Sequence, residues 1–258
     1  MIVDGEKLKY VPGTYAKKRP SAAQLAEQYI LDHEKRQLKL KKTKIKQVEI
    51  APAITVSRKI GAGAVEVADI LAEKLGYRVV DREILDHMAK EKEIRRETIE
   101  FFDERYPGKM SELASMLFGE KSFVMSDYIQ NFVRAVFTFA DMGSTIFVGR
   151  GIHLILPRER VLAVRVISSN EHRIQRLSRI LDVGEKDAET IIGRVDQEQR
   201  DFFKKAFGKK DASPYEFDLV INCDFISEPQ GIAEIAAQAF KQKFAEKIDQ
   251  KESHETLG

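Results

Sequence analysis

The chain has 258 residues, of which 43% are hydrophobic and 33% are charged, and its formal net charge is +2. That length can bury one substantial core, so we expect one main domain with an appendage. The single cysteine, Cys223, excludes an intramolecular disulfide and gives no metal-ligand cluster. No stretch approaches the roughly 18 apolar residues of a membrane helix, and the first residues have no signal-peptide core. These features predict a soluble, cytoplasmic protein with no membrane partner.

The positive charge lies mainly in the first 50 residues, which hold twelve Lys/Arg and six Asp/Glu. Residues 1–20 contain glycine and proline without sustained periodicity, and we expect a loose arm there. Ser21 and Gln24 fit a capping box, and the residues after Ser21 have one apolar stripe at helical spacing. We therefore predict a basic arm with one amphipathic helix over 1–50, a main domain over 51–245 and a polar tail over 246–258.

A basic run lies between residues 35 and 46, with seven Lys/Arg and no acidic residue. Such a run could contact the phosphates of nucleic acid. A solvated helix end or linker is the favoured interpretation, because charge runs are commonly solvated and no aromatic residues separate the lysines for base stacking. Nucleic acid binding by the arm is a secondary hypothesis.

From residue 53 onward, strands and helices alternate, which predicts an α/β domain with a mainly parallel sheet. Five short runs, rich in β-branched residues, are of the kind buried on both faces of a sheet. The predicted strands are 53–57, 78–80, 145–148, 161–167 and 219–222. Between the second and third strands, 91–102 and 122–142 have helical periodicity, and we expect the phenylalanines of this insert and Cys223 to lie in the core.

The region 54–77 has the pattern of a buried strand, a glycine-bearing turn and a helix, a layout that places backbone N–H groups around a phosphate. Gly61, Ala62 and Gly63 supply the small residues of the turn. By itself the turn is a weak signal, because a tight strand-to-helix connection requires glycine for conformational reasons alone. The P-loop rule also requires Gly-Lys-Ser/Thr, where this chain has Gly63, Ala64 and Val65.

The missing lysine and hydroxyl normally neutralise the β/γ-phosphates and ligate Mg²⁺. Arg58 and Lys59 lie at the carboxyl end of the first predicted strand, where doubly wound sheets bind their ligands. They are the nearest cations that could replace the lysine. Glu66, one turn into the helix, could hold a metal, although complementing the helix dipole is the favoured role.

Five further segments follow the loop in a characteristic order. They are VVDREIL at 79–85, FVGRG at 147–151, EHRIQRLSRIL at 171–181, VDQEQRDFFKKAFG at 195–208 and YEFDLVINCD at 215–224. Together with the loop, this order resembles the cytidylate kinase-like family over roughly residues 53–240. The resemblance implies a three-layer P-loop kinase-like fold with a five-stranded sheet. It also implies phosphoryl transfer from ATP, with Mg²⁺, to a (d)CMP-like nucleoside monophosphate.

The family's loop typically reads S-R-x-x-G-S-G-G-R-E, and Ser57, Arg58, Gly61, Gly63 and Glu66 match it. Ala64 replaces a glycine, and Val65 replaces the arginine that could have stood in for the missing lysine. We expect Gly61 to Val65 to cradle the donor phosphates, with Ser57 and Glu66 as further cofactor-binding residues. Because the replacements at positions 64 and 65 add a methyl group and remove a charge, the alternative is a catalytically impaired nucleotide sensor or scaffold.

The resemblance also assigns roles beyond the loop. Asp81 corresponds to the acid of the monophosphate site, where it could hold Mg²⁺-bound water or a sugar hydroxyl, and Arg82 follows it. Arg150 corresponds to the arginine that reaches the acceptor phosphate. Its planar guanidinium can bind two oxygens, and the flanking Gly149 and Gly151 admit close approach. Pairing with a neighbouring helix is the alternative for Arg150.

A helix with three arginines follows the fourth predicted strand. Arg173, Arg176 and Arg179 correspond to the lid arginines of related kinases, which close over ATP. A solvated face with ion pairs is the alternative for each of them. Arg194 and Arg200 extend the basic set as candidate substrate contacts. The sequence does not specify an oligomeric state.

Overall fold

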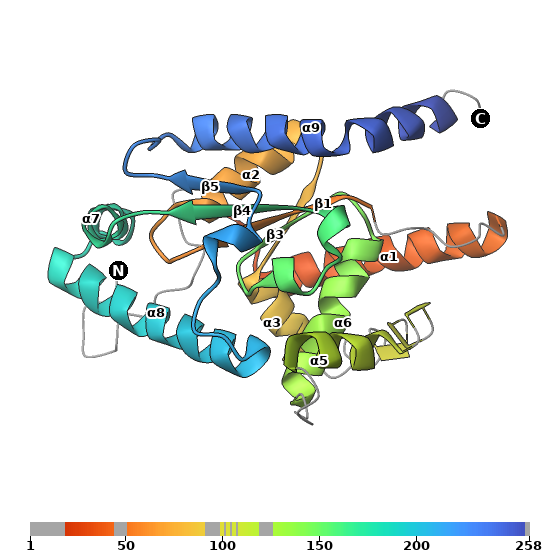
Figure 1. The fold of residues 1–258 in the computed structure, drawn as a ribbon, viewed down its shortest axis with the longest axis horizontal. Helices are drawn as coiled ribbons and strands as arrows, with labels where there is room; N and C mark the ends of the chain where they lie inside the picture. Colours follow the sequence, from red (N-terminus) through yellow and green to blue (C-terminus); the bar gives the residue numbers. More distant parts are fainter. Residues whose placement is uncertain are drawn as a thin grey trace.

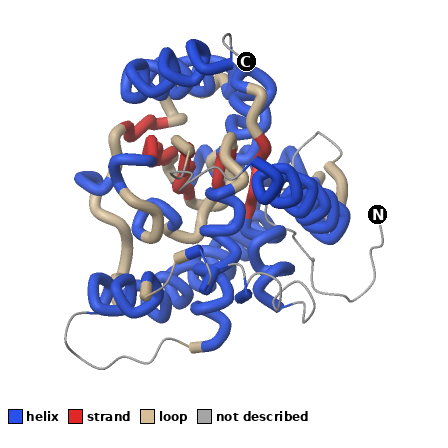
Figure 2. The backbone as a smooth tube through the Cα atoms, turned by 90° about the vertical axis from the view of Figure 1, so that its right-hand side faces the viewer, coloured by secondary structure: helices blue, strands red, loops and turns tan. Residues whose placement is uncertain are grey.

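The computed structural model describes residues 19–43, 51–90 and 126–255, together with 99–118 apart from 101, 104 and 107. A five-stranded sheet lies at its centre, with helices on both faces (Figure 1, Figure 2). The strand order is β2-β3-β1-β4-β5 and every neighbouring pair is parallel. The strands are β1 Ala53–Arg58, β2 Arg78–Asp81, β3 Thr145–Val148, β4 Val161–Ile167 and β5 Leu219–Asn222. The predicted α/β fold is confirmed, and all five strands lie where the sequence placed them to within one residue.

The helices form the two outer layers. They are α1 Ala22–Thr43, α2 Ala64–Leu75, α3 Arg82–Lys90, α5 Lys109–Phe118, α6 Asp127–Asp141, α7 Asn170–Leu181, α8 Glu185–Phe207 and α9 Pro229–Glu255. Three short 3-10 turns are η1 Ile152–Leu154, η2 Arg158–Arg160 and η3 Pro214–Glu216. One core joins α2 and α9 to the sheet, and a second core joins α1, α3 and α6 to its other face.

Successive residues of the strands enter these two cores alternately. Ile54 and Val56 of β1 pack with α2 and α9, whereas Ala53 packs in the core of α3 and α6. Since both faces are covered by helices, the inner strands need apolar residues at almost every position. This requirement explains why short continuous apolar runs, rather than alternating ones, predicted the sheet.

The insert between β2 and β3 contributes a large part of the second core. The expected burial of its phenylalanines is confirmed at Phe102, Phe132, Phe137 and Phe139. Phe101, Phe118 and Phe123 have side chains outside the described residues. The predicted helix over 122–142 is present as α6, which Ser126 caps by accepting a hydrogen bond from the Ile129 N–H at 3.4 Å. Positions 91–98 and 122–125 lie outside the described residues. Cys223 is buried, as expected.

Helix α1 docks directly onto the sheet domain. Its capping box is confirmed, because the Ser21 N–H donates to Gln24 Oε1 at 3.0 Å and the Gln24 N–H donates to Ser21 Oγ at 3.3 Å. Ala26 is fully buried, and the Tyr29 ring meets Phe139 edge to face with centroids 5.7 Å apart. The helix therefore completes the second core of the main domain.

Several expectations for the two chain ends stay predictions. The side chains of 36–46 lie outside the described residues, so the nucleic acid hypothesis for the basic run is untested. The boundaries 1–50, 51–245 and 246–258 are untested as well. Within the described ranges, no helix is long and apolar enough to cross a membrane.

Arg19, in the segment before α1, forms ion pairs with two buried carboxylates. Its Nη1 donates to Asp81 Oδ2 at 2.5 Å, and its Nε lies 3.4 Å from Asp69 Oδ2 on α2. Asp81 Oδ1 also accepts hydrogen bonds from the Glu83 and Ile84 N–H groups at the start of α3. Two carboxylates in one buried region repel each other unless a cation lies between them. Arg19 supplies that cation.

We expect Arg19→Met to lower the free energy of unfolding by about 3 kcal/mol, because it leaves Asp69 and Asp81 buried without their shared cation. Urea denaturation at neutral pH measures the change. Lys241→Met, at an exposed position of α9, is the matched control and should lie within about 0.5 kcal/mol of the unaltered chain. Equal effects of the two substitutions would contradict the role given to Arg19.

Candidate functional site

The turn between β1 and α2 is packed against α7. Gly61 and Gly63 have left-handed φ angles of 82° and 79°, and α2 begins at Ala64 with no side-chain cap. A Cβ atom at Gly61 would lie 3.0 Å from the Arg173 carbonyl oxygen. Glycine is therefore required here both for the turn and for the close approach of α7.

Arg173 is the residue that holds this turn in place. Its side chain is fully buried; Nε donates to the Ile60 carbonyl oxygen at 2.7 Å, and Nη2 donates to Asp196 Oδ1 at 2.7 Å. Nη1 donates to Asn170 Oδ1 at 2.8 Å. One guanidinium thus joins the turn to α7 and α8. Its expected contact with ATP stays a prediction.

Arg176 is the cation nearest to the start of α2. Its guanidinium lies 3.3 Å from the position that a Cβ at Gly63 would take, and its Nη2 donates to Glu66 Oε2 at 2.5 Å. Glu66 therefore has an arginine as its partner in addition to the helix dipole. Arg179, by contrast, is exposed, and its Nε donates to the Gln175 carbonyl oxygen at 3.4 Å.

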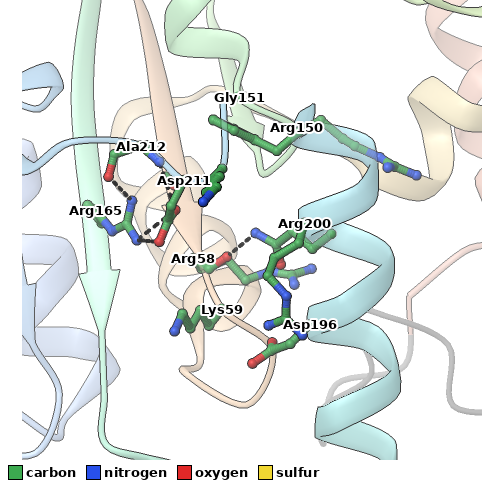
Figure 3. A pocket seen from close by; sticks show the side chains of 13 residues that line it. Arg58, Lys59, Arg150, Gly151, Arg165, Asp196, Arg200, Asp211 and Ala212 are labelled. Atoms are coloured by element: carbon green, nitrogen blue, oxygen red, sulfur yellow. Dashed lines mark hydrogen bonds and ion pairs between the residues drawn. The ribbon is translucent and has the colours of Figure 1, made fainter. Parts of the chain in front are cut away.

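A basic cleft lies at the carboxyl ends of β1 and β3, beside β4 and α8 (Figure 3). Ser57, Arg58 and Lys59 line it from β1 and the following residue. Gln199 and Arg200 line it from α8, and the Gln199 side chain donates to the Arg58 carbonyl oxygen at 2.8 Å. The cleft thus meets the turn at its first residues, whereas Gly61 and Gly63 lie against α7.

Two further cations in the cleft were not identified from the sequence. Arg165, from β4, has Nη2 at 3.2 Å from both carboxylate oxygens of Asp211, and its Nη1 donates to the Ala212 carbonyl oxygen at 3.1 Å. These bonds hold the segment that carries Lys210 at the rim of the cleft. An arginine inside the apolar run VLAVRVI was the available sequence signal for Arg165. Lys210 had none beyond its charge.

The cations of the cleft differ in how far they are neutralised. Lys59 and Lys210 are exposed and have no ion-pair partner among the described residues. Arg200 is also exposed, and its guanidinium donates to the uncharged Gln197 Oε1 at 2.7 and 3.2 Å. Positive charge that is not already paired is available to an anionic ligand such as a phosphate.

Arg150 adopts an uncommon backbone conformation at the end of β3. Its φ is 59°, and it lies between Gly149 and Gly151, which also have positive φ. Arg150 is among the residues that line the cleft, but its side chain runs away from Arg58 and Lys59 (Figure 3). The guanidinium instead donates to Asp86 Oδ2 at 2.6 Å and stacks 4.0 Å from the centroid of the Phe202 ring. The structure thus has the pairing with a neighbouring helix, and contact with an acceptor phosphate stays a prediction.

The remaining predicted site residues are engaged elsewhere or lie outside the cleft. Arg82 Nε lies 3.4 Å from Asp86 Oδ2, and Arg82 Nη2 lies 3.5 Å from Glu198 Oε2 on α8. Arg194 is exposed on α8 and is not among the residues that line the cleft. Asp81 accepts hydrogen bonds from Arg19 and from the start of α3, as described above.

The residues present fit Mg²⁺ only as a nucleotide-bound ion. The described residues include no group of three or more His, Cys, Asp or Glu that could hold a metal. Glu66 and Asp81, the two carboxylates considered for this role, both pair with arginines. Mg²⁺ commonly keeps several waters and binds through substrate phosphates with one or two carboxylates.

A buried histidine supports the segment that follows Arg150. His153 Nε2 lies 3.2 Å from Glu216 Oε2, and the ring donates because a carboxylate only accepts. Burial lowers the pKa of His153 below its usual value of 6.5, and the hydrogen bond to Glu216 opposes this shift. Arg158 and Arg165 also lower it. Burial thus favours the neutral imidazole in the folded protein.

A sequence profile of the cytidylate kinase-like family matches residues 53–224. The resemblance found in the sequence is confirmed. No curated protein matches the chain.

Solved structures similar to this chain include an uncharacterized protein from Eubacterium ventriosum, with 18% identity, a TM-score of 0.58, and coverage of 74% of this chain and 98% of that one. Shikimate kinase from Bacteroides thetaiotaomicron has 15% identity and a TM-score of 0.37, covering 74% and 96%. Dephospho-CoA kinase from Campylobacter jejuni has 12% identity and a TM-score of 0.32, covering 76% and 98%. Of these three, the first supports a shared fold.

We expect Arg173→Met to lower the free energy of unfolding by about 3 to 5 kcal/mol, because it leaves Asp196 without its buried partner and frees the turn at Ile60. Arg179→Met removes the same charge from the exposed side of the same helix and should change stability by less than about 0.5 kcal/mol. Chemical denaturation of both variants measures the difference. A cost for Arg173→Met no larger than that for Arg179→Met would show that the buried arginine does not hold the turn.

The lowered pKa of His153 predicts a loss of stability in acid. Above about pH 6.5 the ring is neutral in both states, and as pH falls below that value the unfolded chain binds a proton that the folded chain resists. The free energy of unfolding should therefore decrease as pH falls from about 7 towards the lowered pKa. His153→Gln keeps a donor to Glu216 but cannot titrate. Urea denaturation at several pH values should show a shallower decrease for this variant, and an unchanged slope would exclude His153 as the cause.

Proposed function

We propose that this chain, which belongs to the cytidylate kinase-like family, transfers a phosphoryl group from ATP to a (d)CMP-like nucleoside monophosphate. One observation carries the proposal: Lys59, Arg200 and Lys210 converge on one cleft at the carboxyl ends of parallel strands without an acidic partner among the described residues. Open α/β sheets bind their ligands at this edge. Three unpaired cations there match the charge of a polyphosphate.

The mechanism is an in-line displacement, in which an acceptor phosphate oxygen attacks the γ-phosphorus and the bond to the β-phosphate oxygen breaks. Such a reaction needs positioning and charge neutralisation rather than covalent chemistry from the protein. Lys59 and Arg58 supply the charge of the absent P-loop lysine, and Arg200 neutralises the transferred group. The first turn of α2, from Gly63 to Glu66, offers uncapped N–H groups to the donor phosphates. Mg²⁺ brought by the nucleotide would add further charge neutralisation.

Arg150 and Arg176 complete the proposed site in a second arrangement of their side chains. Arg176 already lies over Gly63, beside the proposed donor phosphates. Arg150 is among the residues that line the cleft, and in the proposed site its side chain rotates to bring the guanidinium to an acceptor phosphate. Asp81 and Arg82 are proposed acceptor contacts that would first have to leave Arg19, Asp86 and Glu198.

A nucleotide-binding sensor or scaffold without turnover is the second candidate. It is favoured by the pairing of Arg176 with Glu66 at the start of α2 and by Ala64 and Val65, which replace the family's glycine and arginine. In this candidate the cleft binds a nucleotide, but the γ-phosphoryl group is never aligned with an acceptor. Both the kinase and the sensor would bind a nucleotide, but only the kinase would transfer its phosphoryl group.

A nucleotide panel separates the two candidates. Purified protein is incubated with Mg²⁺ and ATP or GTP, and with each of CMP, dCMP, UMP, AMP and GMP, while calorimetry measures nucleotide binding in parallel. Phosphorylation of CMP or dCMP supports the kinase. Binding without any product selects the sensor, and a complete lack of binding selects a scaffold and rejects both nucleotide functions.

We expect Arg200→Ala to lower kcat/KM for phosphoryl transfer by about 100-fold, because it removes a cation that faces the transferred group. Lys205→Ala removes a cation from an exposed position five residues further along α8, outside the cleft, and is the matched control. Steady-state kinetics with ATP and the preferred acceptor measure both. Equal activity of the two variants would place the reaction away from this cleft.

A further inference from the structure

Asp86 on α3 is the centre of a small, partly buried network around Arg150. Its Oδ2 accepts a hydrogen bond from Arg150 Nη2 at 2.6 Å and lies 3.4 Å from Arg82 Nε. Its Oδ1 accepts a hydrogen bond from the Tyr128 hydroxyl of α6 at 2.6 Å. One carboxylate thus holds both arginines that the kinase resemblance assigns to the acceptor side.

In this position the Arg150 side chain does not use all of its hydrogen-bond donors. Its side chain is 10% exposed, yet Nε is buried without a hydrogen-bond partner among the described residues. The guanidinium also stacks on Phe202 of α8. A buried, unpaired donor has a free-energy cost, and a positive φ at a residue other than glycine adds strain. A ligand with more acceptor oxygens than Asp86 provides would relieve the first of these costs.

A phosphate monoester fits this requirement. It carries more negative charge than one carboxylate, and it can accept two parallel hydrogen bonds from the guanidinium fork. Arg150 is among the residues that line the cleft, so a change of its side-chain torsions would bring the guanidinium towards a phosphate bound there. Asp86 and the phosphate would therefore compete for the same cation.

We propose that Asp86 is an internal anion that holds Arg150 in a resting position, and that the acceptor phosphate takes its place. The inference rests on the proposed function, since it concerns the acceptor side of the same site. Arg82 belongs to the same switch, because it joins Asp86 to Glu198 on α8. Release of Arg150 from Asp86 is then coupled to the contact between α3 and α8. Tyr128 sets the position of Asp86 and acts as a positioning residue.

The test measures phosphate binding rather than turnover. Asp86→Asn keeps the shape of the side chain but removes its charge, so Arg150 should bind inorganic phosphate about tenfold more tightly than in the unaltered chain. Phosphorus NMR titration at low ionic strength measures the affinity. Asp103→Asn changes the net charge equally at an exposed position of the insert, where the side chain is 60% exposed and 3.9 Å from Arg134. That control should leave phosphate affinity unchanged.

The combined variant Asp86→Asn/Arg150→Met assigns the effect. If Asp86 acts through Arg150, the tighter phosphate binding disappears in this variant. Phosphate affinity that does not rise in Asp86→Asn, that rises equally in Asp103→Asn, or that persists without Arg150 would overturn the proposal. Should Asp86→Asn fail to fold, Tyr128→Phe decides in its place, because loosening Asp86 should tighten phosphate binding and an unchanged affinity rejects the switch.

These outcomes are independent of phosphoryl transfer. If Asp86→Asn binds phosphate more tightly but the protein transfers no phosphoryl group, the switch is supported and the kinase function is rejected. If the protein transfers phosphoryl groups but its phosphate affinity does not change in Asp86→Asn, the kinase function is supported and the switch is rejected.

Discussion

The buried guanidinium of Arg173 is the interaction on which the site depends. A charge removed from water is tolerated only when its hydrogen-bonding groups are satisfied, and Arg173 meets this condition with partners from the turn, α7 and α8. Arg173 of α7 therefore fixes the position of the turn after β1, and the same side chain joins α8 to both. Gln199, one turn beyond Asp196, then reaches the Arg58 carbonyl oxygen and forms one wall of the cleft.

The basic residues near the turn and the cleft fall into two groups, according to whether they pair with a carboxylate. Arg19, Arg82, Arg150, Arg173 and Arg176 each pair with a carboxylate and hold segments together. Lys59, Arg200 and Lys210 face the cleft without an acidic partner among the described residues. In the proposed function, these cleft residues supply the charge that a P-loop lysine normally provides. The proposed chemistry follows from the second group, and the proposed switch at Asp86 follows from the first.

Local sequence patterns predicted the features that depend on short-range physics. The capping box of Ser21 and Gln24, the five β-branched strands and the glycine turn all involve neighbouring residues, whose preferences the chain displays directly. Membership of the kinase-like family came from the order of several motifs. The local patterns and the order of motifs both agree with the observed α/β fold.

Long-range pairing could not be read from the same patterns. Helical spacing placed Arg173, Arg176 and Arg179 along one helix, but it could not tell that the first is buried, the second pairs with Glu66 and the third is exposed. Asp81 was expected at a metal or sugar, and its partner Arg19 lies 62 residues away in the chain. Arg165 and Lys210 enter the cleft only because β4 and the segment after α8 meet there. Tertiary contacts of this kind have no local signature.

The most direct test is a crystal structure of the protein with Mg²⁺, a non-hydrolysable ATP analogue and CMP. We predict that the triphosphate lies in the cleft in contact with Lys59 and Arg200, and that the CMP phosphate contacts Arg150 in place of Asp86. A triphosphate bound elsewhere, or a cleft still free of nucleotide at saturating concentrations, would contradict the assignment of this cleft as a phosphoryl-transfer site.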